Sequence, residues 1–323
     1  MSKVLILSGD DLNRLLTPEK LIPAIEECFI KYSRREVVMP SRQVMWIHGN
    51  WWGIMPSHIK GYGIAVKVVS VIPSNRDRNL PTIPGAVLYF DEETGLLKAL
   101  MDGAVLTGLR TAAAVSLSIK YLKPTNSGIL AILGTGYQAR YQVRFASKVF
   151  NVEKLKIYDI RRKAMEEFKE YAEGELGLEV YMAEDPKDAI NDADIIIEAS
   201  TAEKPIIYGR SIKRPCHIAS IGAHALNMRV LDDDVIKKAD LIVVDSKDAT
   251  YNETGDIRTP INRGLIKIND LIEIGEFISK GISRGLNDIT IFKTVGIAIE
   301  DLCAAYKAYE LACKKDIGKI IEI

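Results

Sequence analysis

The stretch that decides the fold is Ser127-Gly-Ile-Leu-Ala-Ile-Leu-Gly-Thr-Gly-Tyr-Gln-Ala-Arg140. Its apolar run from Ile129 to Leu133 predicts a buried parallel strand. The glycines that follow fit the pattern G-x-G-x-x-G/A, in which they allow a tight turn and a close approach of the backbone to a pyrophosphate. A helix starting there would present free N–H groups and the positive end of its dipole to the phosphates. The candidate cofactor-binding residues of this motif are Gly134, Thr135, Gly136, Tyr137, Gln138 and Ala139.

Two further features separate this motif from a glycine turn in an ordinary α/β domain. A second strand at 155–158 leads into Asp159, which follows Gly134 by 25 positions. This is near the spacing at which an acidic residue meets the adenosine ribose. Strand patterns then alternate with helical ones, as a doubly wound parallel sheet requires. Asp159 favours NAD, because its carboxylate would repel the 2′-phosphate of NADP, whereas Arg161 and Arg162 could accept that phosphate and leave NADP open.

Composition limits the class of protein. The chain has 323 residues, of which 47% are hydrophobic and 27% charged, and this is enough for two domains with sizeable cores. Lys and Arg number 43, as do Asp and Glu, so no general attraction to nucleic acid or anionic membranes is indicated. The absence of a membrane-span pattern and of a signal-peptide pattern leads us to expect a cytoplasmic protein. The spacing of the four cysteines suggests neither a metal site nor a disulfide framework.

Two kinds of pattern divide the chain. Between residues 37 and 101, short strand-like runs separated by Pro and Gly predict an antiparallel sheet, with a hairpin at 86–101. A helix at 104–122 leads into the dinucleotide-binding part, and a helix at 295–314 is expected to return to the first part. The later strands of the parallel sheet are expected at 178–182, 194–200, 217–222 and 241–245, with Phe277–Ser279 and Ile289–Phe292 as weaker candidates.

Lys67 stands in the middle of the hydrophobic run Ile64-Ala-Val-Lys-Val-Val-Ser70. Burying an unpaired ammonium is costly, so a lysine here needs either a partner or a place on the solvent face of the strand. The functional interpretation places Lys67 in a cleft between the domains, where it would bind a carboxylate or transfer a proton.

Arg42, Arg110 and His224 are the other candidates for chemistry. Arg110 is expected at the start of an alanine-rich helix, where its guanidinium and the helix N-terminus would hold an anion together. For both arginines the alternative is a structural ion pair. His224 follows a predicted strand, and ligands bind beyond the carboxyl ends of strands in open α/β sheets. It is therefore a candidate proton donor or acceptor, and the alternative is an ordinary loop histidine.

Seven stretches, taken in order, resemble the ornithine cyclodeaminase/mu-crystallin family over nearly the whole chain. They are Met39-Pro-Ser-Arg42, Val66-Lys-Val-Val-Ser-Val-Ile-Pro-Ser-Asn75, Leu80-Pro-Thr82, Phe90-Asp-Glu-Glu-Thr-Gly-Leu96, Leu106-Thr-Gly-Leu-Arg-Thr-Ala-Ala-Ala114, Leu133-Gly-Thr-Gly-Tyr-Gln-Ala139 and Phe292-Lys-Thr-Val-Gly-Ile-Ala-Ile-Glu-Asp301. The resemblance implies an α/β protein with a Rossmann domain and a smaller α/β domain that is built from both termini and forms a homodimer. We expect the substrate-binding and dimerisation domain at 1–118 and 297–323, and the Rossmann domain at 119–296.

Members of this family move a hydride between a nicotinamide and the α-carbon of an amino or imino acid. They include alanine dehydrogenases, reductases of ketimines and pyrroline-2-carboxylate, and ornithine cyclodeaminases. By the resemblance, Arg42, Lys67 and Arg110 hold the substrate carboxylate, and Lys67 also takes part in proton transfer. Thr294 and Val295 match a segment that lies near the nicotinamide, and Asp159 and Arg161 complete the expected cofactor site.

Two departures from the family pattern bear on the substrate. Ornithine cyclodeaminases carry a glutamate where this chain has Gly53 and an aspartate where it has His224, and those two acids serve the amino groups of ornithine. We therefore expect an NAD(P)H-dependent oxidoreductase that acts on a small imino or amino acid, with Lys67 or His224 handling the proton. The alternatives are an ornithine cyclodeaminase that recycles its NAD, and a non-catalytic protein that binds NADPH or a small ligand.

Overall fold

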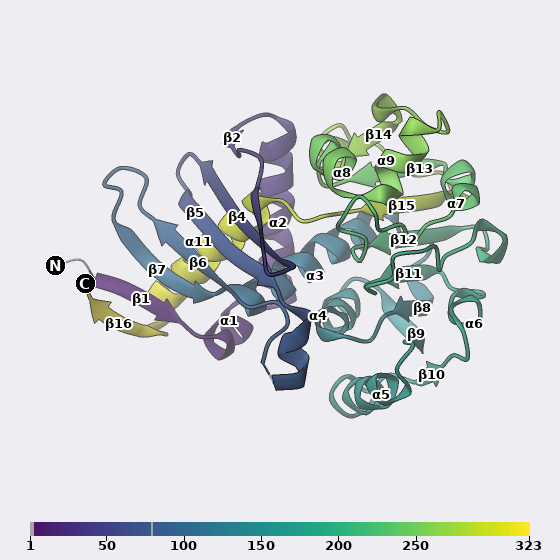
Figure 1. The fold of residues 1–323 in the computed structure, drawn as a ribbon, viewed down its shortest axis with the longest axis horizontal. Coiled ribbons are helices and arrows are strands. Elements are labelled where there is room, and N and C mark those ends of the chain that lie inside the picture. Colours follow the sequence, from purple (N-terminus) through teal and green to yellow (C-terminus); the bar gives the residue numbers. More distant parts are fainter. Residues whose placement is uncertain (1–2, 79) are drawn as a thin grey trace. The chain divides into compact units, whose positions relative to one another are not determined.

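The chain folds into two compact α/β units in the structure, a computed structural model that describes residues 3–78 and 80–323 (Figure 1). Unit 1 comprises residues 1–114 and 296–323, and unit 2 comprises residues 115–295. The sequence placed the first boundary at 118 and the second at 296, slightly later in the chain. Unit 1 is thus assembled from both ends of the chain, and unit 2 is a continuous Rossmann domain.

Unit 1 contains a mixed sheet with strands in the order β16-β1-β7-β6-β5-β4-β2, and β3 pairs with β4. The strands from β4 to β7 are antiparallel, as the runs separated by Pro and Gly predicted, and β6 with β7 forms the hairpin expected at 86–101. β1 is parallel to β7. The strands are β1 (Lys3–Leu7), β2 (Val37–Val38), β3 (Gln43–Ile47), β4 (Asn50–Ile59), β5 (Gly63–Val71), β6 (Gly85–Phe90), β7 (Leu97–Asp102) and β16 (Lys319–Glu322).

One face of this sheet is covered by the C-terminal helix α11, which lies against β4, β5 and β6 and packs on α2 (Figure 1). The buried side of α11 is rich in alanine, including Ala304, Ala305, Ala308 and Ala312, and these small side chains let the helix approach its neighbours closely. The helices of unit 1 are α1 (Gly9–Leu15), α2 (Pro18–Ser33), η1 (Pro73–Arg78), α3 (Gly103–Leu122), which continues into unit 2, and α11 (Ala298–Lys315).

The expectation that the cysteines form no disulfide is wrong for one pair. Cys28 of α2 and Cys303 of α11 are joined; they stand 275 positions apart in the sequence, and their Cα atoms are 6.5 Å apart. Sequence spacing cannot reveal such a pair, because the two helices become neighbours only when both ends of the chain have folded together. The disulfide ties the first and last parts of unit 1.

Unit 2 is built on the doubly wound parallel sheet that the sequence predicted, with strands in the order β10-β9-β8-β11-β12-β15-β13-β14. The strand order changes direction between β8 and β11, and ligands of open α/β sheets bind beyond the carboxyl ends of the strands at such a point. The strands are β8 (Ser127–Leu133), β9 (Asn151–Tyr158), β10 (Val180–Met182), β11 (Ile195–Glu198), β12 (Cys216–Ser220), β13 (Leu241–Val244), β14 (Leu271–Glu273) and β15 (Ile289–Lys293).

Of the two weaker strand candidates, one is confirmed and one is wrong. Ile289–Phe292 lies in β15, between β12 and β13, whereas Phe277–Ser279 lies in helix α10. The run Phe277–Ser279 has only two apolar residues, which is too short for its periodicity to separate a helix from a strand. The helices of unit 2 are α4 (Tyr137–Ala146), α5 (Arg162–Leu176), α6 (Pro186–Ile190), η2 (Gly209–Ser211), α7 (Asp233–Lys238), α8 (Lys247–Glu253), α9 (Gly255–Asn262), η3 (Ile268–Asp270) and α10 (Ile274–Ser279).

The core of unit 2 lies on both faces of its sheet. Leu130 and Ile132 belong to one buried apolar cluster, and Ala131 and Leu133 belong to the other. This alternation explains why the whole run from 129 to 133 is apolar, since a central parallel strand is buried on both sides. Within residues 3–78 and 80–323, no helix is long and apolar enough to cross a membrane.

Candidate functional site

The glycine motif forms the turn between β8 and α4. Gly134 has a φ of +88°, and a Cβ there would lie 2.7 Å from the Cα of Ser200, so the turn requires glycine. Gly136 is the N-cap of α4; no side chain caps it, and a Cβ added there would meet nothing within 4 Å. The approach to the first turn of α4 is therefore open, and its N–H groups can bind a phosphate.

Asp159, directly after β9, is held against this turn. Its Oδ2 accepts hydrogen bonds from the Thr135 backbone N–H at 3.0 Å and from Thr135 Oγ1 at 3.3 Å. Its Oδ1 accepts from the backbone N–H of Arg161 at 2.9 Å and from Arg161 Nε at 3.3 Å. The predicted acidic residue thus lies beside the glycine turn, where a carboxylate that binds the adenosine ribose is expected in this motif.

The residues around this turn fit a dinucleotide. Tyr137 is exposed, Ala139 is buried, and Gln138 Oε1 is buried without a hydrogen-bond partner in the described part of the chain. A buried polar atom without a partner is unfavourable, and a ligand that donates to Gln138 would satisfy it. The open helix start, the fixed carboxylate and this amide oxygen together form a site into which a dinucleotide fits.

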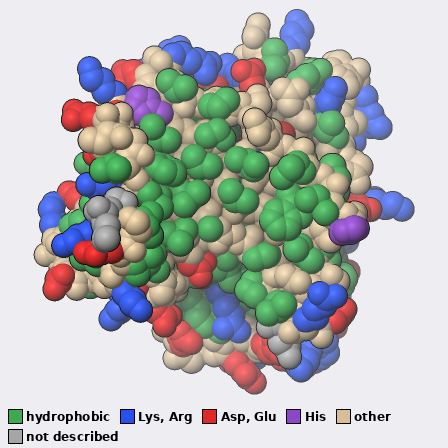
Figure 2. Space-filling view, turned by 60° about the vertical axis from the view of Figure 1, so that its left-hand side comes forward, with side chains coloured by type: hydrophobic (Ala, Val, Ile, Leu, Met, Phe, Trp, Pro, Cys, Tyr) green, Lys and Arg blue, Asp and Glu red, His purple; other side chains and the backbone are tan. Residues whose placement is uncertain are grey.

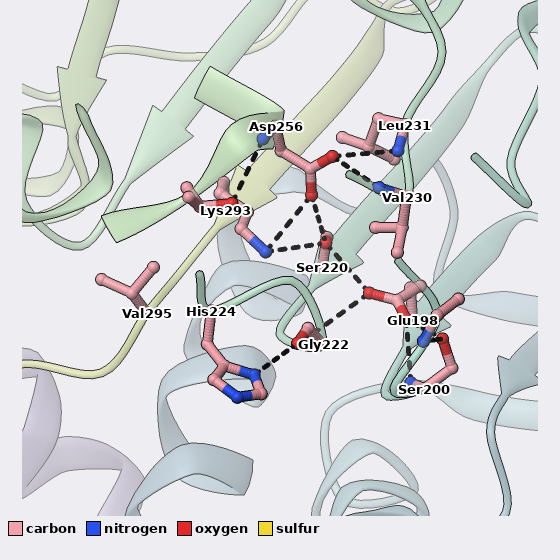
Figure 3. A network of polar contacts seen from close by, with 12 residues as sticks. Glu198, Ser200, Ser220, Gly222, His224, Val230, Leu231, Asp256, Lys293 and Val295 are labelled. Atoms are coloured by element: carbon pink, nitrogen blue, oxygen red, sulfur yellow. Dashed lines mark hydrogen bonds and ion pairs between the residues drawn. The ribbon is translucent and has the colours of Figure 1, made fainter. Parts of the chain in front are cut away.

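A buried network of charged groups lies at the carboxyl ends of three neighbouring strands (Figure 3). Glu198 ends β11, Ser220 ends β12 and Lys293 ends β15, while Asp256 comes from the start of α9. Lys293 Nζ lies 3.1 Å from Ser220 Oγ and 3.4 Å from Asp256 Oδ2. Ser220 Oγ lies 3.1 Å from Glu198 Oε2. All four side chains are fully buried, so each charge depends on the others for stabilisation.

The Glu198 carboxylate fixes the turns that follow β11 and β12. Its Oε1 accepts from the Ser200 backbone N–H at 2.8 Å and from Ser200 Oγ at 2.6 Å. Its Oε2 accepts from the backbone N–H of Gly222 at 3.1 Å. Burial raises the pKa of Glu198, although Lys293 opposes this effect. The network therefore positions the backbone at the edge of the sheet where a ligand would bind.

His224 lies on the turn that this network supports. It is exposed, and its Nδ1 donates to the carbonyl oxygen of Gly222 at 2.7 Å. Because a carbonyl oxygen only accepts, Nδ1 carries the hydrogen, and Nε2 of the neutral ring bears the lone pair. In Figure 3 the imidazole points away from the buried network of Glu198 and Lys293. The ring is thus oriented by backbone and placed where it can exchange a proton.

Thr294 and Val295, which follow β15, form hydrogen bonds with Asp245, the residue directly after β13. Asp245 Oδ2 accepts from Thr294 Oγ1 at 2.6 Å and from the Val295 backbone N–H at 2.9 Å. Asp245 is fully buried. The segment predicted to lie near a nicotinamide is therefore held at the carboxyl edge of the parallel sheet.

In unit 1, Lys67 is buried on the face of the sheet that α11 covers. Only 1% of it is exposed, so the alternative that it lies on the solvent face is wrong. Its Nζ lies 2.8 Å from Asp301 Oδ1, in the first turn of α11. Burial lowers the pKa of Lys67 to about 8, with Arg110 and Arg42 acting in the same direction and Asp301 opposing them. Such a lysine can both bind an anion and transfer a proton near neutral pH.

Arg110 lies two turns inside α3, so the expectation that it starts a helix is wrong and the helix N-terminus cannot assist it. Its Nε lies 3.1 Å from Asp301 Oδ1, and its Nη1 lies 3.1 Å from Glu300 Oε2. Although burial acts to lower the pKa of Arg110, Glu300 and Asp301 raise it above its ordinary value. The structural ion pair that was the alternative for Arg110 is therefore present. It joins Arg110 to Glu300 and Asp301, and Asp301 also pairs with Lys67.

Arg42 joins the same group through the chain segment that precedes α11. Its Nη2 donates to the carbonyl oxygen of Gly296 at 2.6 Å, and a Cβ on Gly296 would collide with the Arg110 guanidinium. Arg42, Lys67 and Arg110 carry three positive charges, and Glu300 and Asp301 carry two negative ones. The group thus brings three cationic side chains together, and a carboxylate of a ligand would be attracted to them.

Several residues of these sites were missed by sequence reasoning. Glu198 and Lys293 end apolar strands and Asp245 directly follows one, so each is a charged residue next to an apolar run, a weaker form of the signal that drew attention to Lys67. Glu300 and Asp301 stand in one of the stretches that resemble the family. Their partners Arg110 and Lys67 are 190 and 234 positions away in the sequence, so spacing cannot reveal these pairs. Asp256 gave no signal, because an acidic residue in the first turn of a helix is ordinary.

Comparison with known proteins identifies the family. The family model of the ornithine cyclodeaminase/mu-crystallin family matches residues 3–316. This chain belongs to that family. Two solved structures of similar fold bear on its chemistry. The Thermococcus litoralis Δ1-pyrroline-2-carboxylate reductase, in complex with NADH and L-proline, is 35% identical with a TM-score of 0.93 over 98% of this chain and 99% of that one. An archaeal alanine dehydrogenase dimer with bound NAD is 30% identical with a TM-score of 0.92 over the full length of both chains.

Among curated relatives, the ketimine reductase mu-crystallin of Rattus norvegicus is 31% identical over 312 residues, which cover 94% of this chain and 96% of the relative. These members of the ornithine cyclodeaminase/mu-crystallin family are named for reactions on amino or imino acids. Their common chemistry agrees with the two groups of residues described above, one suited to a carboxylate and the other to a dinucleotide.

Proposed function

We propose that this protein is an NAD(P)H-dependent oxidoreductase that transfers a hydride between nicotinamide and the α-carbon of a small imino or amino acid. The observation that carries the proposal is the buried pairing of Lys67 and Arg110 with Asp301, which brings two cationic groups together beside Arg42. The activities named for the similar proteins support it, since pyrroline-2-carboxylate and alanine both present a carboxylate beside the reacting carbon.

In this proposal unit 1 binds the substrate and unit 2 binds the dinucleotide, which supplies or accepts the hydride. Arg42, Lys67 and Arg110 hold the substrate carboxylate and so fix the position of its α-carbon, on which the rate of hydride transfer depends. Lys67 exchanges a proton with the substrate nitrogen, and His224 is the second candidate for this role. Gly134 to Ala139, Asp159 and Arg161 bind the adenosine and pyrophosphate, and Thr294 and Val295 border the nicotinamide.

The test is oxidation of NADH and NADPH, followed at about 340 nm, with a panel of substrates. The panel contains pyrroline-2-carboxylate, piperideine-2-carboxylate, and pyruvate with ammonia. Loss of absorbance with any of them supports the proposal, and the preferred member names the activity. Release of ammonia from ornithine with NAD, without a change in absorbance, would instead indicate an ornithine cyclodeaminase.

The pKa of Lys67, lowered to about 8, predicts opposite pH profiles for the two directions. Below this pH the ammonium can donate a proton during imine reduction, and above it the amine can accept one during amino-acid oxidation. We expect kcat/KM for reduction to fall, and kcat/KM for oxidation to rise, as the pH increases through about 8. Profiles measured for both directions between about pH 6 and about pH 10 would check this. Parallel profiles would remove Lys67 from proton transfer.

Asp159 is expected to set a preference for NADH over NADPH. Its carboxylate is fixed by Thr135 and Arg161, so it would repel a 2′-phosphate and accept hydrogen bonds from ribose hydroxyls. In Asp159→Ser, we expect kcat/KM for NADH to fall by about tenfold or more and kcat/KM for NADPH to rise, since Arg161 is then released to meet the phosphate. Steady-state kinetics with both cofactors measures this, and an unchanged NADH to NADPH ratio would contradict it.

We also propose that the protein is a homodimer that associates through the bare face of the unit 1 sheet, opposite α11. Apolar side chains gather on this side of the molecule, with charged side chains around its rim (Figure 2). Pro56, Val66, Leu88 and Leu100 form one cross-strand row on β4 to β7, and each is only partly buried. An exposed apolar patch of this kind marks an association surface, and the archaeal alanine dehydrogenase is a dimer.

Light scattering after size exclusion would measure the mass, which we expect to be twice the 35.9 kDa of the chain. A Val66→Glu, Leu88→Glu double variant places two charges in the middle of the row and is expected to be monomeric. Leu286→Glu is the matched control, because Leu286 is 96% exposed in unit 2. A double variant that stays dimeric would place the interface elsewhere.

A further inference from the structure

An indole ring covers a glycine next to the cationic group of unit 1. Trp51, Gly53 and Met55 occupy every second position of β4, so their side chains lie on the same face of the sheet. On β5, Met55 pairs with Lys67 and Gly53 pairs with Val69. If Gly53 had a Cβ, three atoms of the Trp51 ring would lie within 3.0 Å of it. The Trp51 ring therefore fills the space that a side chain at position 53 would take, on the same face of the sheet as Lys67.

Trp51 belongs to a small apolar cluster that adjoins the cations. We call this cluster the apolar wall; it consists of Met39, Trp51, Met55, Val69, Ile83 and Ala298. The wall adjoins the charged group at two places. Met55 lies opposite Lys67 in the sheet, and Ala298 begins the helix turn that carries Glu300 and Asp301. A ligand whose carboxylate is held by the cations has this wall beside it.

We propose that the apolar wall receives the hydrocarbon side chain of the substrate, and that Trp51 determines the substrate class. This inference rests on the proposed function. A charged side chain would lose its hydration against the wall without gaining a partner there. A five- or six-membered ring would instead bury apolar area against the indole face. The substrate class is therefore a cyclic imino acid with an uncharged ring rather than a diamino acid.

The test compares Trp51→Ala with wild type on a cyclic imine and on pyruvate with ammonia. The methyl group of the pyruvate imine is too short to depend on Trp51, whereas a ring should lose contact worth a factor of about 10 to 200. We expect kcat/KM for the cyclic imine to fall by about tenfold or more and kcat/KM for pyruvate to change by less than about threefold. Trp52→Ala is the control, because Trp52 is the next indole along β4 and its side chain lies on the opposite face of the sheet from Trp51.

A second variant tests the same idea from the other side. In Gly53→Ala the added methyl group must displace the Trp51 ring, so the loss should again be confined to the cyclic substrate. A loss of equal size for both substrates, or no loss for either, would overturn the role of Trp51.

Calorimetric binding of L-proline and L-ornithine gives a readout that does not depend on turnover. We expect L-proline to bind more tightly than L-ornithine in the wild type, and to bind more weakly to Trp51→Ala. If the wild type reduces no imine but this binding pattern holds, the proposed oxidoreductase activity fails and the apolar wall stands. If turnover is found and L-ornithine binds as well as L-proline, the wall is refuted and the oxidoreductase stands.

Discussion

A Lys67→Met variant is expected to lose about three orders of magnitude in kcat/KM for imine reduction. The methionine keeps the length and apolar stem of the lysine but can neither hold a carboxylate nor donate a proton. Asp301 keeps a partner in Arg110 Nε, which lies 3.1 Å from its Oδ1, so the buried carboxylate is not left alone. The loss should therefore come from chemistry and substrate binding rather than from unfolding.

A measurement of cofactor affinity and a control variant show whether the loss is specific to the site. NADH affinity, measured by fluorescence, should stay within about a factor of three, because Lys67 lies in unit 1 and the dinucleotide motif in unit 2. Lys60→Met serves as the control, since Lys60 is an exposed lysine at the turn between β4 and β5 and should have full activity. If Lys67→Met keeps the wild-type kcat/KM, Lys67 is not in the site.

A Lys293→Met variant should show the largest loss of stability. It removes the cation from a fully buried network that retains Glu198 and Asp256. Leaving buried charge without its partner costs about 3–5 kcal/mol, so the free energy of unfolding should fall by about that amount. Urea unfolding followed by circular dichroism would measure the change, with Lys60→Met again as the control.

The double variant Lys293→Met, Asp256→Asn separates charge from packing. The introduced asparagine keeps an oxygen for the N–H groups of Val230 and Leu231, which in the wild type donate to Asp256 Oδ1 at 2.8 and 3.0 Å. Because the double variant removes one negative charge along with the positive one, it should recover part of the lost stability. A double variant less stable than Lys293→Met would mean that the loss came from packing around the lysine stem.

The sequence predicted what depends on local pattern. The strand-turn-helix at Gly134 could be predicted because glycine spacing, apolar run and following acid are all within about 30 residues. Lys67 could be singled out because a charge in the middle of an apolar run has few explanations. Its partner Asp301 could not, since 234 residues separate the two and only the folded sheet and helix bring them together. The disulfide from Cys28 to Cys303 was missed for the same reason.

Two errors have a different origin. Arg110 was expected at a helix start although the helix itself was predicted at 104–122, close to the observed Gly103–Leu122, so the error was in the position of Arg110 within the helix and not in the helix boundary. Glu198 lay within the strand predicted at 194–200 and Lys293 directly followed the candidate strand Ile289–Phe292, and no partner was predicted for either charge. The requirement that buried charges be paired applies to them as it does to Lys67, and it would have predicted the network.

The division of unit 1 between both ends of the chain has a consequence for biosynthesis. A ribosome delivers residues 115–295 as one continuous stretch, so unit 2 needs no later part of the chain to complete its sheet. Unit 1 does depend on a later part, because α11, which covers its sheet, is translated after the whole of unit 2. Until then Lys67 and Arg110 lack Asp301 and Glu300. Residues 3–78 and 80–114 of unit 1 are therefore translated before unit 2, but they complete their charged group only after the residues of unit 2 have been made.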